Sequence, residues 1–329
     1  MKNVTVLWAL VVMMAMLFTG QAVAEEVTGC PLGLKKGEFW VKSQTTYLYA
    51  ERALWTNERA EKAVMMDMPE NWHQRMTRSS LRLGYGITDR LDVGLLLAYF
   101  DKHVRRGNHK QKPNGSWFVK EADKEGQGFG DVWLSAKYKI VADKQHIESI
   151  SLGAGFRLDA SDDCNVTKGI GSGAKAFRAV LLTHEHFGQF HFCNHLYYEW
   201  QGDRRGIDVR NQKGELVKWE KSGQNIGDKI GYKFNVEYCI SKDATIWAHL
   251  GLIGWHKFED QDCDGVSIDR SDRYEHSVFP KFVWLPQGPA NEHHKIFLGV
   301  KCPYKYRRDF ESHVIPVLSM MWTWGGESG

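Results

Sequence analysis

The sequence predicts an all-β chain, an antiparallel up-and-down transmembrane β-barrel of about 12 strands. Three observations predict this fold. The chain of 329 residues opens with an export signal, its strand-like segments alternate apolar and polar residues, and the connections between them alternate between long and short. Together these features are typical of a porin-like barrel in the outer membrane of a Gram-negative cell.

Residues 1–24 are expected to be a secretory signal peptide. Lys2 gives a positive start, an apolar run extends from Val4 to Leu17, and Ala22-Val23-Ala24 forms a cleavage site before Glu25. Such a run is too short and wrongly flanked for a lasting membrane helix.

A second interpretation of this region stays open. Val27-Thr28-Gly29-Cys30 resembles the box at which lipoproteins are cleaved and acylated, here on Cys30. Two acidic residues, Glu25 and Glu26, separate it from the apolar run and suit such a box poorly.

The composition of the rest of the chain excludes several classes. No later apolar stretch approaches the roughly 18 residues that a helical span needs. The formal net charge of +3 argues against a nucleic-acid partner. The chain has 32 Gly, 13 Trp, 12 Tyr and 16 Phe, which favours β-structure with aromatic belts at the membrane interfaces.

Residues 230–240 show the alternation most clearly. One face would carry Ile230, Tyr232, Phe234, Val236, Tyr238 and Ile240, and the other Gly231, Lys233, Asn235, Glu237 and Cys239. Neighbouring side chains of a strand point to opposite faces, whereas a helix would scatter every second residue around its surface.

About twelve segments of this kind follow one another, each of about 10–16 residues and so long enough to cross a bilayer when tilted. They begin near Phe39, His73, Leu91, Gly128, Glu148, Gly173, Gln189, Asn225, Ala244, His276, His294 and Glu311.

The connections predict the topology. Short or moderate turns are expected at 88–90, 141–146, 187–188, 241–243 and 287–292, and longer loops at 51–72, 103–127, 160–172, 201–224, 259–274 and 304–310. Short periplasmic turns, long extracellular loops and periplasmic termini fit an outer-membrane barrel. A soluble all-β protein, the alternative, has no reason to place its long loops at one end.

Boundaries and irregularities complete the prediction. Residues 25–38 would be a periplasmic segment, 39–324 the barrel and 325–329 a tail. Pro280 and Pro316 fall inside two late strands, where proline indicates bulges or strand boundaries. The stretch from Glu51 to Glu70 has a helix-like composition and predicts a short extracellular helix.

Three segments carry a resemblance to a known family. They are the strand–turn–strand LGYGITDRLDVGL at 83–95, GFGDVWLSAKY at 128–138 and LGVKCP at 298–303. They resemble the outer-membrane transporter family associated with the meta-pathway of phenol degradation, over about residues 79–324. The chain departs from that pattern at its end, where GGESG follows Trp322-Thr323-Trp324 and leaves the position of the insertion signal open.

The resemblance implies a channel or transporter for passive passage of small, hydrophobic or aromatic solutes, and no enzymatic activity. The alternative is a structural or accessory barrel with a plugged lumen and loops that bind a partner. The expected partners are outer-membrane lipid, the barrel-insertion machinery and small solutes, with no nucleic acid.

Charged residues on the polar faces would line the lumen. The predicted lumen-facing set is Arg78, Arg82, Asp131, Lys137, Lys139, Arg157, Glu199, Lys233, Glu237 and Lys301, with Asp92 and Asp159 beside them. Such charges either pair across the lumen and plug it, or set the selectivity of an open path.

An acidic loop is the only cofactor candidate. Asp260, Asp262 and Asp264 precede Gly265 in the D-x-D-x-D-G pattern that opens calcium-binding loops. Ser271 stands where such loops have a bidentate Glu, and the alternative is a solvated acidic loop. Otherwise no cofactor is expected.

The six cysteines allow 15 complete pairings, so the sequence cannot choose among them. Cys164 and Cys263 lie in two predicted outer loops and are one candidate disulfide. Cys193 and Cys239 lie on the lumen face of neighbouring strands and are a second.

Two chemical sites are disfavoured. His184, His186, His191 and His195 gather around one turn, but ligands two residues apart on a strand lie too far apart to chelate tightly. A lipid hydrolase would need Ser and His at one height on the lipid face, and Ser312 and His313 face opposite ways.

Overall fold

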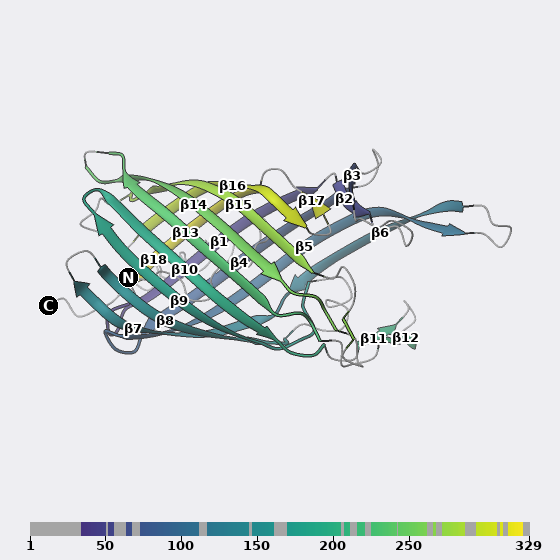
Figure 1. Ribbon diagram of the computed structural model, residues 1–329, viewed down its shortest axis with the longest axis horizontal. Helices are drawn as coiled ribbons and strands as arrows, with labels where there is room; N and C mark the ends of the chain where they lie inside the picture. The colour runs from purple at the N-terminus through teal and green to yellow at the C-terminus, as the bar shows by residue number, and fades with distance from the viewer. Residues whose placement is uncertain are drawn as a thin grey trace, which may run out of the picture.

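Twelve antiparallel strands close into one barrel, as the computed structural model shows (Figure 1). The structure describes residues 34–50, 52–55, 64–67, 73–111, 117–144, 147–160, 170–204, 207–210, 216–220, 225–241, 243–261, 266–267, 272–286, 294–307, 310–311 and 315–324. The predicted all-β barrel of about 12 strands is therefore confirmed.

The barrel strands follow the predicted segments closely. They are β1 (Phe39–Ala50), β4 (His73–Gly86), β5 (Leu91–Gln111), β7 (Val132–Lys144), β8 (Ile147–Leu158), β9 (Ala176–Phe187), β10 (Phe190–Gln201), β13 (Lys229–Cys239), β14 (Ile246–Lys257), β15 (Arg273–Trp284), β16 (His294–Arg307) and β18 (Ile315–Trp324).

Closure joins the first and last strands. β1 pairs with β18 on one side, with Phe39 opposite Trp324, and with β4 on the other side. Because β4 also pairs with β5, the ring has no open edge. A closed ring leaves no unpaired strand edge, which is what a lipid environment requires of β-structure.

Alternation gives the barrel two different walls. Along β9, Ala176, Arg178 and Leu182 are buried, whereas the intervening Phe177 and Leu181 are exposed. The outer wall of the other strands exposes large apolar side chains in the same way, which suits contact with lipid. Inward-facing positions are therefore the buried alternate residues of each strand.

Local hydrogen bonds fix the short turns. Thr88 Oγ1 accepts hydrogen bonds from the backbone N–H groups of Arg90 and Leu91, at 3.2 and 3.0 Å. Gly188 adopts a φ of 63°, which favours glycine, in the two-residue β9–β10 hairpin. In the β13–β14 turn, hydrogen bonds from Ser241 and Thr245 hold the pKa of the Asp243 carboxyl below its ordinary value.

The other end of the barrel carries the long connections. β5 continues beyond the barrel and pairs with β6 (Trp117–Phe129), so that the two strands form a ribbon that projects far from it (Figure 1). β11 (Ile207–Arg210) pairs with β12 (Leu216–Glu220) in a second, short hairpin. Because short turns face the periplasm in outer-membrane barrels, we expect these connections to lie outside the cell.

Between Glu51 and Glu70, where the sequence predicts a short helix, the described residues form strands. β2 (Arg52–Trp55) and β3 (Val64–Asp67) pair with each other, and β17 (Phe310–Glu311) pairs with β2. Residues 56–63, which carry most of the helix-like composition, lie outside the described residues.

The two prolines differ in their effect. Pro316 is the second residue of β18 and so stands at a strand boundary, as predicted. Pro280 lies within β15, and the pairing with β16 is interrupted at Phe279 and Pro280 without a change of register. A separate shift of register falls between His276 and Ser277. None of the described residues forms a helix that is long and apolar enough to cross a membrane.

Candidate functional site

Many charged side chains of the barrel lie on its inward wall. Of the predicted lumen-facing residues, Arg82, Lys137, Glu199 and Lys301 are buried at inward positions. Arg78, Asp131, Lys139, Arg157, Lys233 and Glu237 are half-buried on the same wall, and Asp92 is buried. The strand periodicity therefore brings these charges to one surface, where their contacts define the candidate site.

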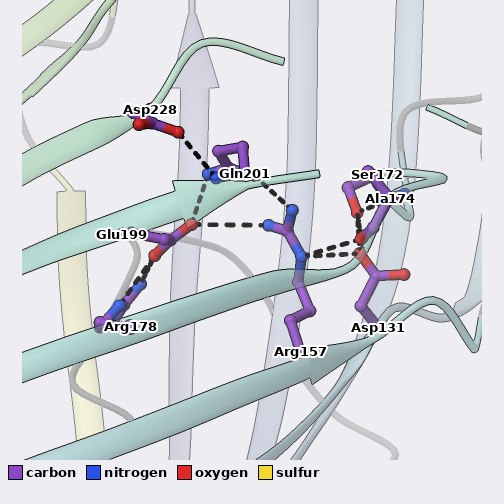
Figure 2. Close-up of polar contacts among 8 residues, drawn as sticks. All are labelled: Asp131, Arg157, Ser172, Ala174, Arg178, Glu199, Gln201 and Asp228. Atoms are coloured by element: carbon purple, nitrogen blue, oxygen red, sulfur yellow. Dashed lines mark hydrogen bonds and ion pairs between the residues drawn. The ribbon is translucent and has the colours of Figure 1, made fainter. Parts of the chain in front are cut away.

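Glu199 is the centre of a network near the long-loop end (Figure 2). It forms an ion pair with Arg178, its register partner on β9, and lies 3.7 Å from Arg157 Nη1 on β8. Gln201 Nε2 donates a hydrogen bond of 2.5 Å to Glu199 Oε1, the oxygen nearest Arg157, whereas Arg178 pairs with Oε2. One buried carboxylate thus holds two guanidinium groups, which compensates for its removal from water.

Arg157 connects this centre to the next part of the wall (Figure 2). Its Nη2 donates to Gln201 Oε1 at 2.5 Å, its Nε donates to the Ala174 carbonyl at 3.2 Å, and Asp131 lies 3.8 Å away. Ser172 Oγ donates to Asp131 at 2.5 Å. The segment that precedes β9 is therefore hydrogen-bonded to the inward wall.

Aromatic rings support the same arginines. The Arg178 guanidinium lies 4.6 Å from the ring centroid of Trp133 and 4.5 Å from that of Tyr197. Arg157 lies 5.5 Å from Trp133. Tyr197 in turn occupies the space beside Gly231, where a Cβ atom would come within 2.3 Å of its ring. Glycine is needed at that position to admit the ring.

Separate ion pairs lie elsewhere on the inward wall. Lys137 Nζ lies 3.3 Å from Asp92, which also accepts a hydrogen bond of 3.0 Å from the Leu34 backbone. Lys301 pairs with Glu275. His249 Nδ1 lies 2.9 Å from Glu237 Oε1. Each of these pairs joins two strands that are hydrogen-bonded neighbours, so the pairs run along the wall.

Sequence reasoning missed Arg178, Glu275 and His249 as members of the site. Arg178 was hidden because its inward neighbours Ala176 and Val180 are as apolar as the outward residues of β9, so the alternation there lacks a polar face. The missing signal was the periodicity of the adjacent strands, whose register fixes the inward side of β9.

The candidate disulfide between Cys193 and Cys239 is wrong. Cys193 stands opposite Asn235, and Cys239 follows four residues later on β13. At about 3.3 Å per residue they are about 13 Å apart along the strands, beyond the roughly 7 Å between Cα atoms that a disulfide can span. Cys164 and Cys263 lie outside the described residues.

The predicted calcium loop is described only at its first residue. Asp260 Oδ1 accepts a hydrogen bond of 2.8 Å from the Gly227 backbone and lies 2.5 Å from Lys257 Nζ. Asp262 and Asp264 lie outside the described residues. Within the described ranges no group of three or more His, Cys, Asp or Glu side chains is arranged to hold a metal ion.

The closed barrel with an apolar outer wall defines an outer-membrane β-barrel of the porin-like class. Its fold is similar to that of a crystallised outer membrane channel from Pseudomonas putida F1, with a TM-score of 0.64 and 12% sequence identity, over 91% of this chain and 100% of that one.

Two further solved structures are less similar. The CymD monoaromatic hydrocarbon channel matches with a TM-score of 0.38 and 10% identity, over 89% of each chain. The translocator domain of the autotransporter NalP from Neisseria meningitidis matches with a TM-score of 0.45 and 8% sequence identity, over 89% of this chain and 90% of that one. At these values the likeness supports no functional argument.

No protein-family model matches the sequence, and no curated protein is detectably similar to it. The link to phenol degradation that the three sequence segments suggested therefore stays a resemblance. The similarity in fold supports the outer-membrane class alone.

Proposed function

We propose that this chain is an outer-membrane channel, through whose lumen small solutes diffuse passively. The observation that carries the proposal is the direction of the inward ion pairs. The ion pairs of Lys137, Lys301 and Glu237 each join adjacent strands. The ion pairs of Arg157 on β8 reach Asp131, just before the adjacent β7, and Glu199 on β10, two strands away. Pairs of this kind satisfy buried charges along the wall, without side chains that have to meet across the barrel.

The number of strands supports the same function. Barrels of about 8 strands are filled by their own side chains, while those of 16–18 strands leave an aqueous channel. Twelve strands give an intermediate width, suited to small solutes. The similar Pseudomonas putida protein is itself described as an outer membrane channel, which agrees with this proposal.

The nature of the solute is a finer part of the proposal. The inward wall presents the rings of Trp133, Tyr197, Trp255 and Phe297 among its charges. Flat apolar surfaces of this kind suit solutes with a hydrophobic or aromatic part. No covalent chemistry is needed for such a path, because binding and release along the wall are sufficient.

One observation favours the alternative, a structural barrel with a plugged lumen. Ile170 and Ala174 are buried beside the network around Arg157, and a Cβ atom on Gly130 would lie 3.0 Å from the Ile170 carbonyl. A segment held there would narrow the lumen near the long-loop end. Partner-binding loops would then be the functional part.

Conductance of the purified protein in planar lipid bilayers distinguishes the two functions. A channel produces discrete current steps on insertion, and their size increases with salt concentration. Heat-unfolded protein at the same concentration is the matched control. Insertion of folded protein without any current would refute the channel and support the plugged barrel.

A further inference from the structure

Four histidines lie on the inward wall at the short-turn end of the barrel. His184 and His186 on β9 and His191 on β10 stand on either side of the β9–β10 hairpin, and His249 lies on β14. The side chains of His184 and His249 are buried, and those of His186 and His191 are half-buried. Together with Glu237, at an inward position of β13, we call them the histidine cluster.

Strand register brings the cluster together across the sheet. His191 stands opposite His186 on β9 and opposite Glu237 on β13. Glu237 in turn stands opposite His249 on β14. The four strands are hydrogen-bonded neighbours in the order β9, β10, β13 and β14, and side chains at opposite positions of paired strands have Cβ atoms about 5 Å apart. One row of the wall therefore carries three imidazoles and a carboxylate, with His184 one inward position further from the hairpin.

The imidazole rings of β9 and β10 are close enough to influence one another's charge. The ring centroids of His184 and His191 are 5.5 Å apart, and those of His186 and His191 are 6.2 Å apart. The ring of Trp247, from β14, lies 5.2 Å from that of His191 in a T-shaped arrangement. Like charges at such separations repel each other, and less water around them weakens the repulsion less. A proton on one ring therefore makes the next proton harder to add.

Glu237 is the carboxylate of the cluster. Its Oε1 lies 2.9 Å from His249 Nδ1 and accepts a hydrogen bond of 3.6 Å from Cys193 Sγ. Protonation of His249 makes this contact an ion pair and balances the charge of Glu237. Because the cluster has four histidines and one carboxylate, each further proton gives it net positive charge.

Other ionisable groups face the cluster from the strands around it. Besides Cys193 they are His195 on β10, Lys233 and Cys239 on β13, and Lys281 on β15, which stands opposite His249. The described inward residues of β8 at this height, Ser149 and Ser151, are uncharged. Among the described inward residues of β9, β10, β13 and β14, the only other acid is Glu199, near the long-loop end of β10. Below about pH 7 the charge of this part of the wall therefore changes through its histidines.

We propose that protonation of the histidine cluster makes the lumen more selective for anions as the pH falls. This inference rests on the proposed channel function and names a selectivity element of the same lumen. An imidazole that binds a proton adds one positive charge to the wall, whichever groups it contacts. Positively charged side chains that line a pore favour anions, and walls of low dielectric constant concentrate their field on the path.

The zero-current potential in a gradient of KCl across a planar bilayer measures this selectivity. Between about pH 7.5 and about pH 5.5, on either side of the ordinary histidine titration, the ratio of chloride to potassium permeability should rise several-fold. The rise should spread over a wider pH range than one isolated histidine gives, because the rings share their repulsion. The quadruple variant His184→Gln, His186→Gln, His191→Gln and His249→Gln should keep the ratio nearly constant.

The double variant His256→Gln and His276→Gln is the matched control. Both histidines belong to the outer wall. His276 Nδ1 lies 2.9 Å from Tyr232 Oη, and the ring of His256 lies 5.1 Å from that of Phe258, which is exposed. Their loss removes two titrating rings from the protein and none from the lumen, so the control should keep the wild-type response to pH.

A permanent charge separates the effect of charge from that of packing. His191→Lys is positively charged at both pH values, so it should raise the chloride preference already at about pH 7.5 and shrink the further rise on acidification. A change of gel mobility on heating shows that each variant is folded. If the quadruple variant does not fold, His191→Lys and the double variant His184→Gln and His191→Gln decide the question, and the latter should lose a large part of the pH response.

Four results are distinguishable. A wild-type current with the same permeability ratio at both pH values would overturn the inference and leave the channel function intact, whereas absence of any current at either pH would overturn the channel function. A folded quadruple variant that keeps the full pH response would refute the role of the cluster. Equal loss of that response in the outer-wall control would refute it as well.

Discussion

Substitution of Phe234 by arginine tests which wall of the barrel faces lipid. Phe234 is the middle residue of the eleven in β13, and its side chain is 47% exposed on the outer wall. Its ring stacks on that of Tyr232, with centroids 5.2 Å apart, and its register partners are Asn194 and Leu252. The substitution therefore places a charge near the middle of the membrane.

The expected cost follows from two terms. An arginine on the lipid face near the bilayer midplane costs about 2–4 kcal/mol. Loss of the ring contact with Tyr232 adds about 0.5–1.5 kcal/mol. Together Phe234→Arg should lower the free energy of unfolding by about 3–5 kcal/mol, because the terms arise from different interactions.

Urea unfolding of the protein in lipid vesicles, followed by tryptophan fluorescence, measures this cost. Phe234→Leu is the matched control and should lose only about 1 kcal/mol, since it keeps an apolar outward side chain. Lys233→Arg, on the inward wall, should be nearly neutral. Equal destabilisation by Lys233→Arg and Phe234→Arg would mean that the two walls are assigned wrongly.

Three further predictions concern the network, the acidic loop and the cysteines. Glu199→Ala leaves the buried arginine Arg178 without its ion-pair partner and should destabilise the barrel by about 3–5 kcal/mol in the same unfolding assay, while alanine at exposed Glu259 should have little effect. Calorimetric titration should show weak calcium binding, near the millimolar range, that an Asp262→Asn and Asp264→Asn double variant abolishes; identical traces would leave a solvated loop. Mass mapping should find Cys164 joined to Cys263, and two free thiols there would exclude the bridge.

The fold was predictable from the sequence because the alternation of apolar and polar residues along a strand can be recognised without tertiary information. Phe39, His73, Leu91 and His294 begin strands where the alternation predicts, and the other barrel strands begin within a few residues of their predicted starts. After Glu51 the composition favours a helix, whereas the described residues on both sides of 56–63 pair as strands. Short segments follow their partners more than their own propensity.

The candidate site was predictable only in part. Alternation found Arg157 and Glu199, but it could not show that Arg178 joins them, because pairing partners depend on strand register. The same limit explains the wrong pair of Cys193 and Cys239, which share a face but differ in height along their strands. The side of a strand to which a side chain points follows from the sequence alone, whereas its position along the barrel axis depends on turns and bulges.

Solute entry into vesicles tests the central claim, that the barrel lumen is a path for small solutes, most directly. Vesicles that contain the purified protein are diluted into isotonic solutions of neutral solutes of increasing size, and swelling is followed by light scattering. The account predicts swelling that is fastest for the smallest solute and slows as the solute grows. Swelling no faster than in protein-free vesicles, with the barrel shown to be folded and inserted, would contradict it.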